Sequence, residues 1–541
     1  MRNSRFFPAA ILAVVLSAIA GGFFGSSVLA TQDEASQQYR VFAAALAAID
    51  REYVEEVPSD RLVYGAIDGM LKTLDPHSSF FDPRAYAQMR ERQEGKYYGL
   101  GIQIQVIDGD ITVMSIFEGS PAFKKGLRRG DVIARIEGQD AKGWTSEQAV
   151  RKLKGPKGTM VDISIKRRGY DQLIDMDVVR DEVNITTVRG AFMMDAQTGY
   201  VKLGEFSETS DREVGHALES LKAKGMKRLV FDLRDNPGGA LDQAIAISNR
   251  FLPRGDMIVF TKGRIPTADQ KYRAEEESEY THVPMVVLVN RNSASASEIV
   301  SGALQDHDRA LVVGETTFGK ALVQSVYRIS GNAGLALTTG RYYTPSGRLI
   351  QRPWDGSFDE YLTYTLRDQK SEREHSSVDL KYTDAGRKVY SGGGIEPDKF
   401  IAGPVEGFSP TRFGRQLYAR GSFANFADQF VAEGDTRFSD ASKSKKRIAR
   451  GFTVTDEMIQ DFRTSLKTQK IKIDEEAFKI DEQFIRAMVR YDIDLALFGV
   501  EEARRNLIGR DPQAQFALEQ FGEAQRLTEL ARATTRGGKG N

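Results

Sequence analysis

The chain has 541 residues, which is too long for one hydrophobic core and predicts a protein of several domains. Lysine plus arginine and aspartate plus glutamate both number 75, so the net charge is zero and no basic surplus favours nucleic acid as a partner. The absence of cysteine excludes disulfides, thiolate metal sites and cysteine nucleophiles. The five histidines lack metal-ligand spacing, so we expect no metal and no other cofactor.

The first thirty residues have the pattern of an export signal. Arg2 and Arg5 precede an apolar run over residues 6–24, and Val28-Leu29-Ala30 supplies small residues at a plausible cleavage site. The run is also long enough to span a bilayer, so residues 1–30 predict either a cleaved signal peptide or a retained membrane anchor. In both cases we expect the rest of the chain to lie in the periplasm of the cell envelope.

Two segments with different patterns follow the export signal. Residues 31–95 predict a helical N-terminal segment, because apolar residues recur there at helical spacing. From about residue 96 the pattern changes to short strands of alternating apolar and polar residues. Residues 97–104 place Gly-Leu-Gly-Ile directly before a strand, and residues 146–153 predict an amphipathic helix opened by Ser146. Residues 96–180 therefore predict a separate β-rich module.

The order of glycine loop, strand and helix in this module resembles a PDZ domain. In PDZ domains the backbone amides of a Gly-Leu-Gly-Phe loop receive the terminal carboxylate of a peptide, and the next strand pairs with it. A simple hairpin turn is the alternative explanation of the glycine pair. The resemblance implies that four residues bind the peptide, with isoleucine where phenylalanine is common: Gly99, Leu100, Gly101 and Ile102.

The next segment predicts an α/β core with a mixed sheet. From residue 198 to about residue 305, continuous apolar strands alternate with helices, which is typical of a largely parallel sheet covered on both faces. We assign residues 181–401 to this core. Beyond about residue 402 the strands end, and periodic apolar residues predict a helical C-terminal extension over residues 402–541. We expect that extension to mediate oligomerisation or adaptor binding.

Two strand ends in the core carry residues suited to catalysis. Residues 231–241 run from a buried strand through Asn-Pro-Gly-Gly into a helix, so the amides of Gly238 and Gly239 can hold an anion. Residues 287–304 form a second strand, polar turn and helix, which presents a hydroxyl beside helix N-terminal amides. The pattern alone does not separate the three serines in this turn, which are Ser293, Ser295 and Ser297.

A third turn, between two apolar strands within residues 310–326, contains Lys320. Burial disfavours an ammonium ion, so we expect Lys320 to supply a neutral base. The same turn matches the nucleotide-binding pattern Gly-x-x-x-x-Gly-Lys over Gly314–Lys320. However, Ala321 lacks the hydroxyl that would bind Mg²⁺, and the following residues alternate like a strand instead of opening a helix. The sequence therefore disfavours an NTPase.

These segments together resemble the carboxy-terminal processing proteases, also called tail-specific proteases or peptidase family S41, over roughly residues 35–400. The matching motifs extend along that range: Leu74–Pro83, Asp232–Gly239, Ser293–Glu298, Phe318–Lys320, Tyr342–Gln351 and Gly392–Asp398. The resemblance implies that Ser295 is the nucleophile, that Lys320, 25 residues later, is the general base, and that Gln324 positions the lysine. It also implies an oxyanion hole formed by the amide of Ala296 and by Gly238 or Gly239.

The family resemblance implies a serine endopeptidase that cleaves envelope proteins with free C-terminal tails. A non-catalytic scaffold that only binds tails is the alternative function. His307 is a possible triad member, but its place at a helix end favours a surface position. Arg180, at the exit of the PDZ-like module, is either a relay between tail binding and the catalytic residues or a solvated linker charge.

Overall fold

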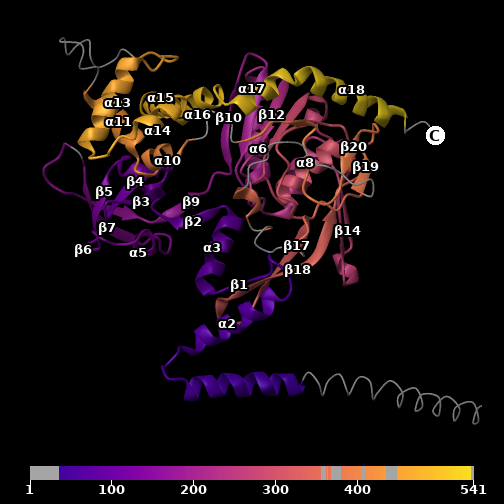
Figure 1. Cartoon of the computed structure of the whole chain (residues 1–541), viewed down its shortest axis with the longest axis horizontal. Coiled ribbons are helices and arrows are strands. Elements are labelled where there is room, and N and C mark those ends of the chain that lie inside the picture. The colour runs from indigo at the N-terminus through magenta and orange to yellow at the C-terminus, as the bar shows by residue number, and fades with distance from the viewer. Residues whose placement is uncertain are drawn as a thin grey trace, which may run out of the picture. The chain divides into compact units, whose positions relative to one another are not determined.

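The computed structural model describes residues 36–167, 169–354, 361, 363–366, 379–403, 410–433 and 448–537 (Figure 1). The predicted export signal, residues 1–30, lies outside the described residues. The chain divides into two compact units, Met1–Pro83 with Val326–Leu337, and Arg84–Ser325 with Thr338–Asn541. No helix in the described ranges combines the length and the apolar content needed to cross a membrane.

The first unit contains the predicted N-terminal helices. Residues 36–52 are helical, and α2 (Ser59–Lys72) leads through a turn to β1 (Ser79–Phe81), which pairs antiparallel with residues 334–336 of β18 (Gly334–Tyr343). Asp75 shapes this turn, because its carboxylate accepts hydrogen bonds from the amides of His77 and Ser78, both at 2.8 Å. The motif at residues 74–83 thus forms the turn that leads into β1 and the strand itself.

The PDZ-like module begins after α3 (Pro83–Glu94). A short pair, β2 (Lys96–Gly99) with β9 (Asp181–Asn184), closes its base. Its main sheet is antiparallel, in the order β3-β4-β5-β7-β8, with β6 paired to β5. The strands and helices of the module are β3 (Ile102–Ile107), β4 (Asp110–Ile116), α4 (Pro121–Lys124), β5 (Val132–Ile136), β6 (Gln139–Asp140), α5 (Ser146–Leu153), β7 (Met160–Lys166) and β8 (Ile174–Val179).

Helix α5 has the predicted bounds, but its N-cap differs from the prediction. Thr145 caps the helix, because its side chain accepts a hydrogen bond from the Gln148 amide while the Gln148 side chain accepts one from the Thr145 amide. Ser146 is the first helical residue, as predicted, and Thr145 before it has the capping role. Ala149 and Leu153 turn inward and pack in the core of the module, as the amphipathic pattern predicted.

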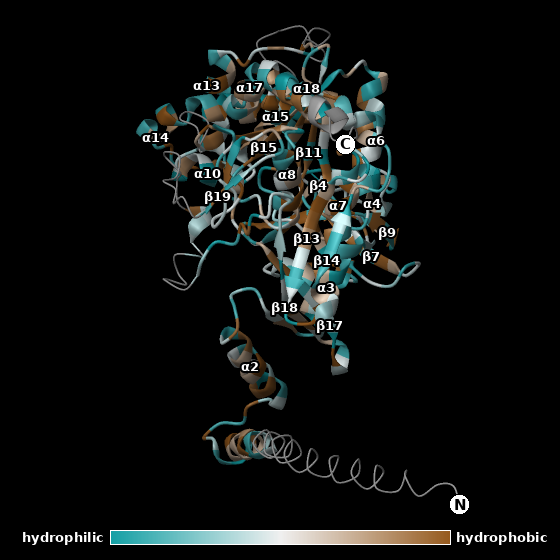
Figure 2. Cartoon of the chain, turned by 90° about the vertical axis from the view of Figure 1, so that its right-hand side faces the viewer, coloured by the Kyte–Doolittle hydropathy of each residue, from teal (hydrophilic) through white to brown (hydrophobic). Residues whose placement is uncertain are grey.

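The second unit also holds a six-stranded mixed sheet in the order β10-β11-β12-β15-β16-β21. Its first strand pair is antiparallel and the other neighbours are parallel, which confirms the predicted mixed sheet. Figure 2 shows apolar residues, in brown, in strands of the interior. The strands are β10 (Val188–Met193), β11 (Thr198–Leu203), β12 (Arg228–Asp232), β15 (Met285–Val289), β16 (Leu311–Gly314) and β21 (Lys399–Phe400).

Helices cover both faces of this sheet. Alternate strand residues, such as Phe231 and Val287, pack in one cluster with α6 (Ser210–Ala223), α7 (Leu241–Asn249) and α8 (Ala296–Asp306). The opposite strand residues, such as Val230 and Val286, pack with α17 (Pro512–Glu519) and α18 (Phe521–Gly537) (Figure 1). A smaller sheet beside this core contains β13 (Met257–Gly263), β14 (Gln270–Arg273), β17 (Leu322–Arg328) and β18.

The C-terminal residues are helical, as predicted, but they pack in two places. In the described part of this region, five helices surround their own aromatic core, which includes Phe423, Phe426 and Phe462: α10 (Arg412–Ala419), α11 (Ser422–Glu433), α13 (Asp456–Thr468), α14 (Glu475–Ile480) and α15 (Glu482–Phe498). Helix α16 (Val500–Ile508) follows them, and α17 and α18 then pack on one face of the core sheet. The sequence analysis treated this whole region as one extension, and it did not foresee that its last two helices cover the sheet.

Candidate active site

The serine turn lies between the fully buried strand β15 and helix α8. Ser295 is the N-cap of α8 and has φ 55° and ψ −112°, a backbone conformation that costs energy for any residue with a Cβ. The hydroxyls of its neighbours are engaged: Ser293 Oγ donates to Leu233 O at 2.8 Å, and Ser297 Oγ donates to Asn236 O at 2.9 Å. Both of those serines are fully buried, whereas Ser295 is half-buried.

The glycine turn after β12 lies directly against Ser295. A Cβ placed on Gly238 would be 2.8 Å from Ser295 Cβ and 2.9 Å from the Ala296 nitrogen. Both distances are too short for nonbonded atoms, so only glycine fits at this position. The Gly238 amide donates to Asn236 Oδ1 at 2.9 Å, and the Asn236 carbonyl accepts from the Ala294 amide at 3.0 Å. The structure therefore brings Gly238, Ser295 and Ala296 together, as the sequence predicted. The next residue, Gly239, forms a β-bridge with Phe206.

The lysine turn joins β16 to β17. Lys320 is half-buried, and its Nζ donates to Gln324 Oε1 at 2.9 Å. The Ala321 amide donates to Gln351 Oε1 at 2.8 Å, so the motif at residues 342–351 supports this turn from outside. The chain continues from Lys320 into a strand and opens no helix, so the nucleotide-binding reading of residues 314–320 lacks the helix N-terminus that would hold phosphates.

The motif at residues 392–398 supports the lysine turn from the other side. The Thr317 amide donates to Ile395 O at 3.0 Å, and the Ile395 amide donates to Thr317 Oγ1 at 2.6 Å. Arg352 adds a third connection, because its Nε donates to Phe318 O at 2.8 Å and its Nη2 to Gly393 O at 2.6 Å. These contacts show that motifs far apart in the sequence hold the turn that contains Lys320.

Glu298 joins the serine turn to the lysine turn. Its Oε2 accepts hydrogen bonds from the Ser295 amide at 2.8 Å and from the Lys320 amide at 2.9 Å. Its Oε1 accepts from Thr317 Oγ1 at 2.5 Å and from the Gly319 amide at 2.7 Å. The side chain is fully buried, and this burial raises its pKa to about 7 although all four hydrogen bonds favour the ionised form.

Tyr342 forms a second bridge between the two turns. Its hydroxyl lies 2.6 Å from Lys320 O and 3.1 Å from Ser295 O, and its ring is buried. The sequence analysis assigned no role to Tyr342 or Glu298, although both lie in the motifs that it quoted. A charged residue at the start of the largely apolar helix predicted after the serine turn was the signal that could have identified Glu298, because a carboxylate is rarely buried without hydrogen-bond partners.

The glycine turn is held from below by a buried ionic cluster. Arg234 donates to Asp232 Oδ2 at 2.7 Å. It also contacts the start of the C-terminal helix α17, where it pairs with the N-cap Asp511 Oδ2 at 2.7 Å and donates to Gln513 Oε1 at 2.8 Å. Burial acts to raise the pKa of Asp232, but Arg234 and its other partners hold that pKa well below its usual range. The C-terminal helices thus anchor the residue four positions before Gly238.

His307 lies at the far end of α8, about 18 Å from Ser295 at 1.5 Å of rise per residue. Its ring nitrogens contact Asp384 Oδ2 at 2.6 Å and Met257 O at 2.7 Å, and only 10% of the side chain is exposed. The predicted surface position is therefore wrong. Burial acts to lower the pKa of His307, but its two partners raise that pKa to about 9. The distance excludes contact with Ser295.

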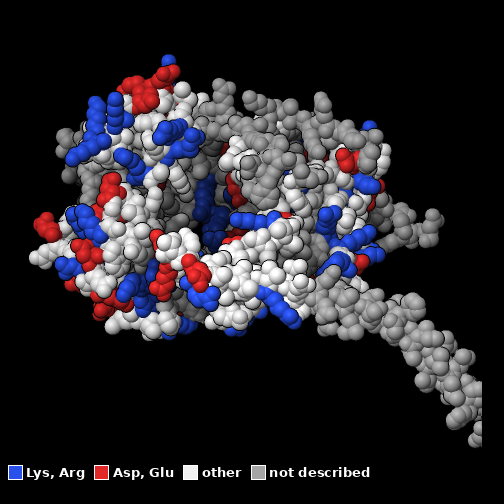
Figure 3. All heavy atoms as spheres, turned by 60° about the horizontal axis from the view of Figure 1, so that its bottom comes forward, with Lys and Arg blue, Asp and Glu red and all other residues white. Residues whose placement is uncertain are grey.

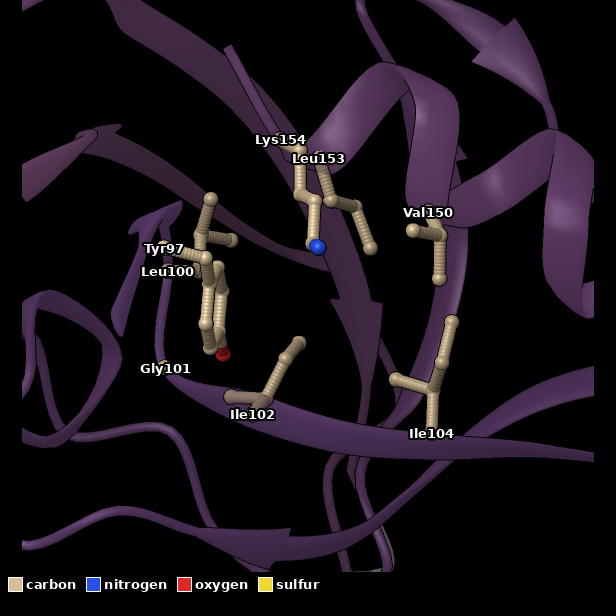
Figure 4. Close-up of a pocket in the computed structure, with 8 residues that line it drawn as sticks. All are labelled: Tyr97, Leu100, Gly101, Ile102, Ile104, Val150, Leu153 and Lys154. Carbon is tan, nitrogen blue, oxygen red and sulfur yellow. The ribbon is translucent and has the colours of Figure 1, made fainter. Parts of the chain in front are cut away.

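The PDZ-like module contains a cavity of about 50 Å³ between β3 and α5 (Figure 4). It is lined by Tyr97, Leu100, Gly101, Ile102, Ile104, Val150, Leu153 and Lys154. Three of the four predicted peptide-binding residues are therefore at the cavity. The fourth, Gly99, does not line it and pairs with Asp181 at the end of β2.

The carbonyls of the glycine loop point away from this cavity. Leu100 O accepts from the Ala122 amide at 2.9 Å, and Gly101 O accepts from the Phe117 amide at 2.9 Å. Because the N–H and C=O of one peptide unit point in opposite directions, the amides of Gly101 and Ile102 face the other side. Both amides are thus turned away from the bonded carbonyls, and the Gly101 amide lies beside the Tyr97 phenol oxygen.

Arg180 is not a solvated linker charge. Its side chain is 8% exposed, and its guanidinium donates to Lys152 O at 2.7 Å, Leu153 O at 3.1 Å and Met160 O at 2.8 Å. It therefore caps the C-terminal end of α5, next to the cavity, by satisfying carbonyls that lack helical partners. Its use as a relay stays a prediction.

Comparisons with known proteins identify the family. Residues 197–355 match peptidase family S41, and the chain is 37% identical over 349 residues to the carboxy-terminal-processing protease of Bartonella bacilliformis. That alignment covers 62% of this chain and 80% of the relative. The chain belongs to the carboxy-terminal processing proteases. It is also 35% identical to the carboxy-terminal processing protease CtpA of Bacillus subtilis, over 64% of this chain and 74% of that protein.

Other parts of this protease match further models. Residues 88–166 match the PDZ domain, residues 26–85 the N-terminal domain of the activating protease CtpB, and residues 413–490 a family of unknown function, DUF8443. A solved photosystem II D1 C-terminal processing protease is 28% identical and covers 66% of this chain and 92% of its own, with a TM-score of 0.34. The chain is thus a serine peptidase of family S41 that contains a PDZ domain.

Proposed function

We propose that this protease cleaves peptide bonds with Ser295 as the nucleophile and Lys320 as the general base. The main supporting observation is the Glu298 carboxylate, which accepts hydrogen bonds from the backbone amides of both residues. Gln324, bonded to Lys320 Nζ, orients the lysine. A substrate can reach the half-buried Ser295, whereas the neighbouring serine hydroxyls are buried and donate to backbone carbonyls.

The proposed reaction has two steps. Neutral Lys320 takes the proton of Ser295 Oγ while this oxygen attacks the carbonyl carbon of the scissile peptide. The Lys320 ammonium then gives its proton to the departing amine, which leaves an acyl-enzyme on Ser295. The same lysine deprotonates a water molecule, which attacks the acyl carbon. The bond to Ser295 Oγ breaks, Oγ takes the proton back from the lysine, and the second product leaves with a new carboxyl end. This cycle needs no histidine, consistent with the distance of His307 from Ser295.

We propose the amides of Ala296 and Gly239 as the donors that stabilise the oxyanion. Ala296 is the first residue of α8, where an amide has no intrahelical partner. The Gly238 amide already donates to Asn236 Oδ1, while the Gly239 amide makes no hydrogen bond within the described part of the chain. This difference favours Gly239 over Gly238, two residues that the sequence did not separate.

A serine-reactive fluorophosphonate probe and a protein substrate test the dyad together. Ser295→Ala should lose labelling and cleavage, and the matched control Ser297→Ala should keep labelling. Lys320→Arg should lose cleavage, because a guanidinium stays protonated and cannot act as a base. Wild-type turnover in Lys320→Arg would refute the dyad, and absence of Ser295-dependent labelling would support a non-catalytic scaffold.

We further propose that the PDZ domain captures the free C-terminal tails of substrate proteins. Two observations support this: the amides of Gly101 and Ile102 face away from their bonded carbonyls, and the adjacent cavity is largely aliphatic. Such a site suits a tail with an apolar last residue. Mass spectrometry of peptides that accumulate with the wild-type enzyme but not with Ser295→Ala would identify the tails.

We propose that the protease acts on proteins of the cell envelope after export through residues 1–30, and that α10–α15 mediate assembly. The support is the arginine-flanked apolar run of the sequence and the separate core of these helices. Cell fractionation with N-terminal sequencing would distinguish a cleaved signal from an anchor, and a cytoplasmic protein would refute export.

Light scattering of the chain with and without residues 410–498 would test assembly. A full-length chain that is already monomeric, with no change in state on removal of these residues, would refute that proposal.

A further inference from the structure

A single cation faces the PDZ cavity among its described lining residues. Lys154 follows the last residue of α5, and Figure 4 shows its ammonium directed toward the interior of the cavity. Its Nζ lies 4.5 Å from the centre of the Tyr97 ring, and it forms an ion pair with Glu91. Every other lining residue is apolar, a glycine or this tyrosine, so Lys154 is the residue that gives the cavity its charge.

Tyr97 occupies the space between the lysine and the glycine loop. Burial raises the pKa of Tyr97 to about 12, and the Gly101 amide acts in the opposite direction, which places that amide beside the phenol oxygen. The Gly101 amide therefore lies at the hydroxyl end of the ring, and the Lys154 ammonium lies 4.5 Å from the centre of the same ring. A carboxylate that takes the place of the phenol oxygen would meet a backbone donor close to an ammonium, and hydrogen bonds to ionised groups are the strong ones.

Glu91 is the ion-pair partner of Lys154. It lies on α3, whose end is fixed by hydrogen bonds from the Glu208 amide to Gln93 O at 2.9 Å and from the Ile185 amide to Gly95 O at 2.7 Å. Both side chains of the Glu91–Lys154 pair are about one third exposed, and exposed pairs of this kind are weak. A second carboxylate can therefore compete for the lysine.

We propose that Lys154 pairs with the terminal carboxylate of a substrate tail, and that Glu91 competes with the tail for this lysine. The inference rests on the proposed capture of tails by the PDZ domain and adds the residue that recognises their charged end. It explains why a lysine lies at an otherwise uncharged cavity. It also predicts that the enzyme distinguishes a free C-terminus from a blocked one chiefly through one side chain.

Binding of fluorescein-labelled ten-residue peptides to the full-length Ser295→Ala protein tests this proposal. The peptides end in Ala, Val, Leu, Ile or Phe, and each is made as the free acid and as the C-terminal amide. We expect the parent protein to bind at least one free acid about tenfold more tightly than its amide. Lys154→Gln should remove most of that preference, and Glu91→Gln should tighten binding of the acid several-fold.

The matched control is Lys152→Gln. It removes the same charge two residues earlier, in the last turn of α5, from a residue that pairs with Glu137 and lies outside the cavity lining. This variant should keep the preference for the acid. An unchanged preference in Lys154→Gln, or unchanged affinity in Glu91→Gln, would overturn the inference while leaving tail capture intact. Failure of the parent protein to bind any of the free acids would overturn both tail capture and the role of Lys154.

Discussion

Replacing Glu298 with glutamine tests whether one buried carboxylate keeps the serine and lysine turns in register. The substitution preserves size and removes one acceptor oxygen. If the new NH₂ group takes the place of Oε2, it faces the amides of Ser295 and Lys320, which are both donors. If it takes the place of Oε1, it faces the Gly319 amide and the Thr317 hydroxyl, and the hydroxyl can rotate to accept.

The second orientation costs less. It leaves one backbone N–H, that of Gly319, without a partner, whereas the first leaves the two N–H groups of Ser295 and Lys320 without one. A buried donor in that state costs about 1–3 kcal/mol. If the whole cost falls on the productive arrangement of Ser295 and Lys320, kcat decreases by about 5-fold to 150-fold. Glu298 is buried and touches no substrate, so KM should stay near the wild-type value.

The effect of Glu298→Gln on the free energy of unfolding depends on pH. The native pKa of Glu298 is about 7 and the ordinary pKa of a glutamate is 4.5, so the native state binds this proton more tightly than the unfolded state. The resulting stabilisation is present below pH 4.5 and is lost as the pH rises through 7, by about 3 kcal/mol in all. Glutamine does not titrate, so Glu298→Gln should lack the decrease in stability that the wild type shows between pH 5 and pH 8.

Steady-state kinetics and urea unfolding at pH 5 and pH 8 check both expectations. Glu213→Gln is the matched control, since Glu213 also accepts from two backbone amides, those of Thr187 at 2.8 Å and Val188 at 3.0 Å, and lies on α6 away from both turns. The control should lose stability and keep kcat. Wild-type kcat in Glu298→Gln at pH 8 would refute the reasoning.

Three further changes have defined outcomes. Gly238→Ala should reduce activity more than tenfold with little change in KM, because its Cβ would lie 2.8 Å from Ser295 Cβ; a nearly active variant would contradict this packing. Asp511→Asn should destabilise the chain by about 1–3 kcal/mol in thermal unfolding and lower kcat, because it removes a carboxylate from buried Arg234. His307 has a native pKa of about 9, so the stabilisation that its protonation gives the folded state is complete below pH 6.5 and is lost as the pH rises through 9. The unfolding free energy of His307→Gln should lack this decrease. The same pH profile in the variant and the wild type would contradict the expectation.

The sequence predicted much of the core and the site because the relevant signals are local. Continuous apolar strands such as Met285–Val289 indicate burial on both faces, and both faces of that strand are covered. Glycine and serine turns at strand ends indicate a site at the sheet edge, and Gly238 does lie against Ser295. The family spacing supplied what the local pattern lacked, a reason to prefer one of three serines.

Other features depend on distant partners, so no local pattern reveals them. Arg180 resembles a linker charge until the carbonyls at the end of α5 are placed around it. His307 resembles a surface residue until Asp384 and the Met257 carbonyl close over it. Charged side chains of both signs are interspersed on the described part of the face in Figure 3, so charge alone does not indicate a site there.

The sequence by itself determined the α/β core, the PDZ-like module, the helical ends and the motifs that carry the chemistry, because periodicity and turn residues act over a few positions. Only the tertiary structure decided how these motifs combine. It joined Ser295 to Lys320 through Glu298, and it placed Asp511, from a region treated as an extension, on Arg234 beneath the glycine turn. The reason is physical: a buried charge requires partners, and those partners come from any segment that the fold brings near.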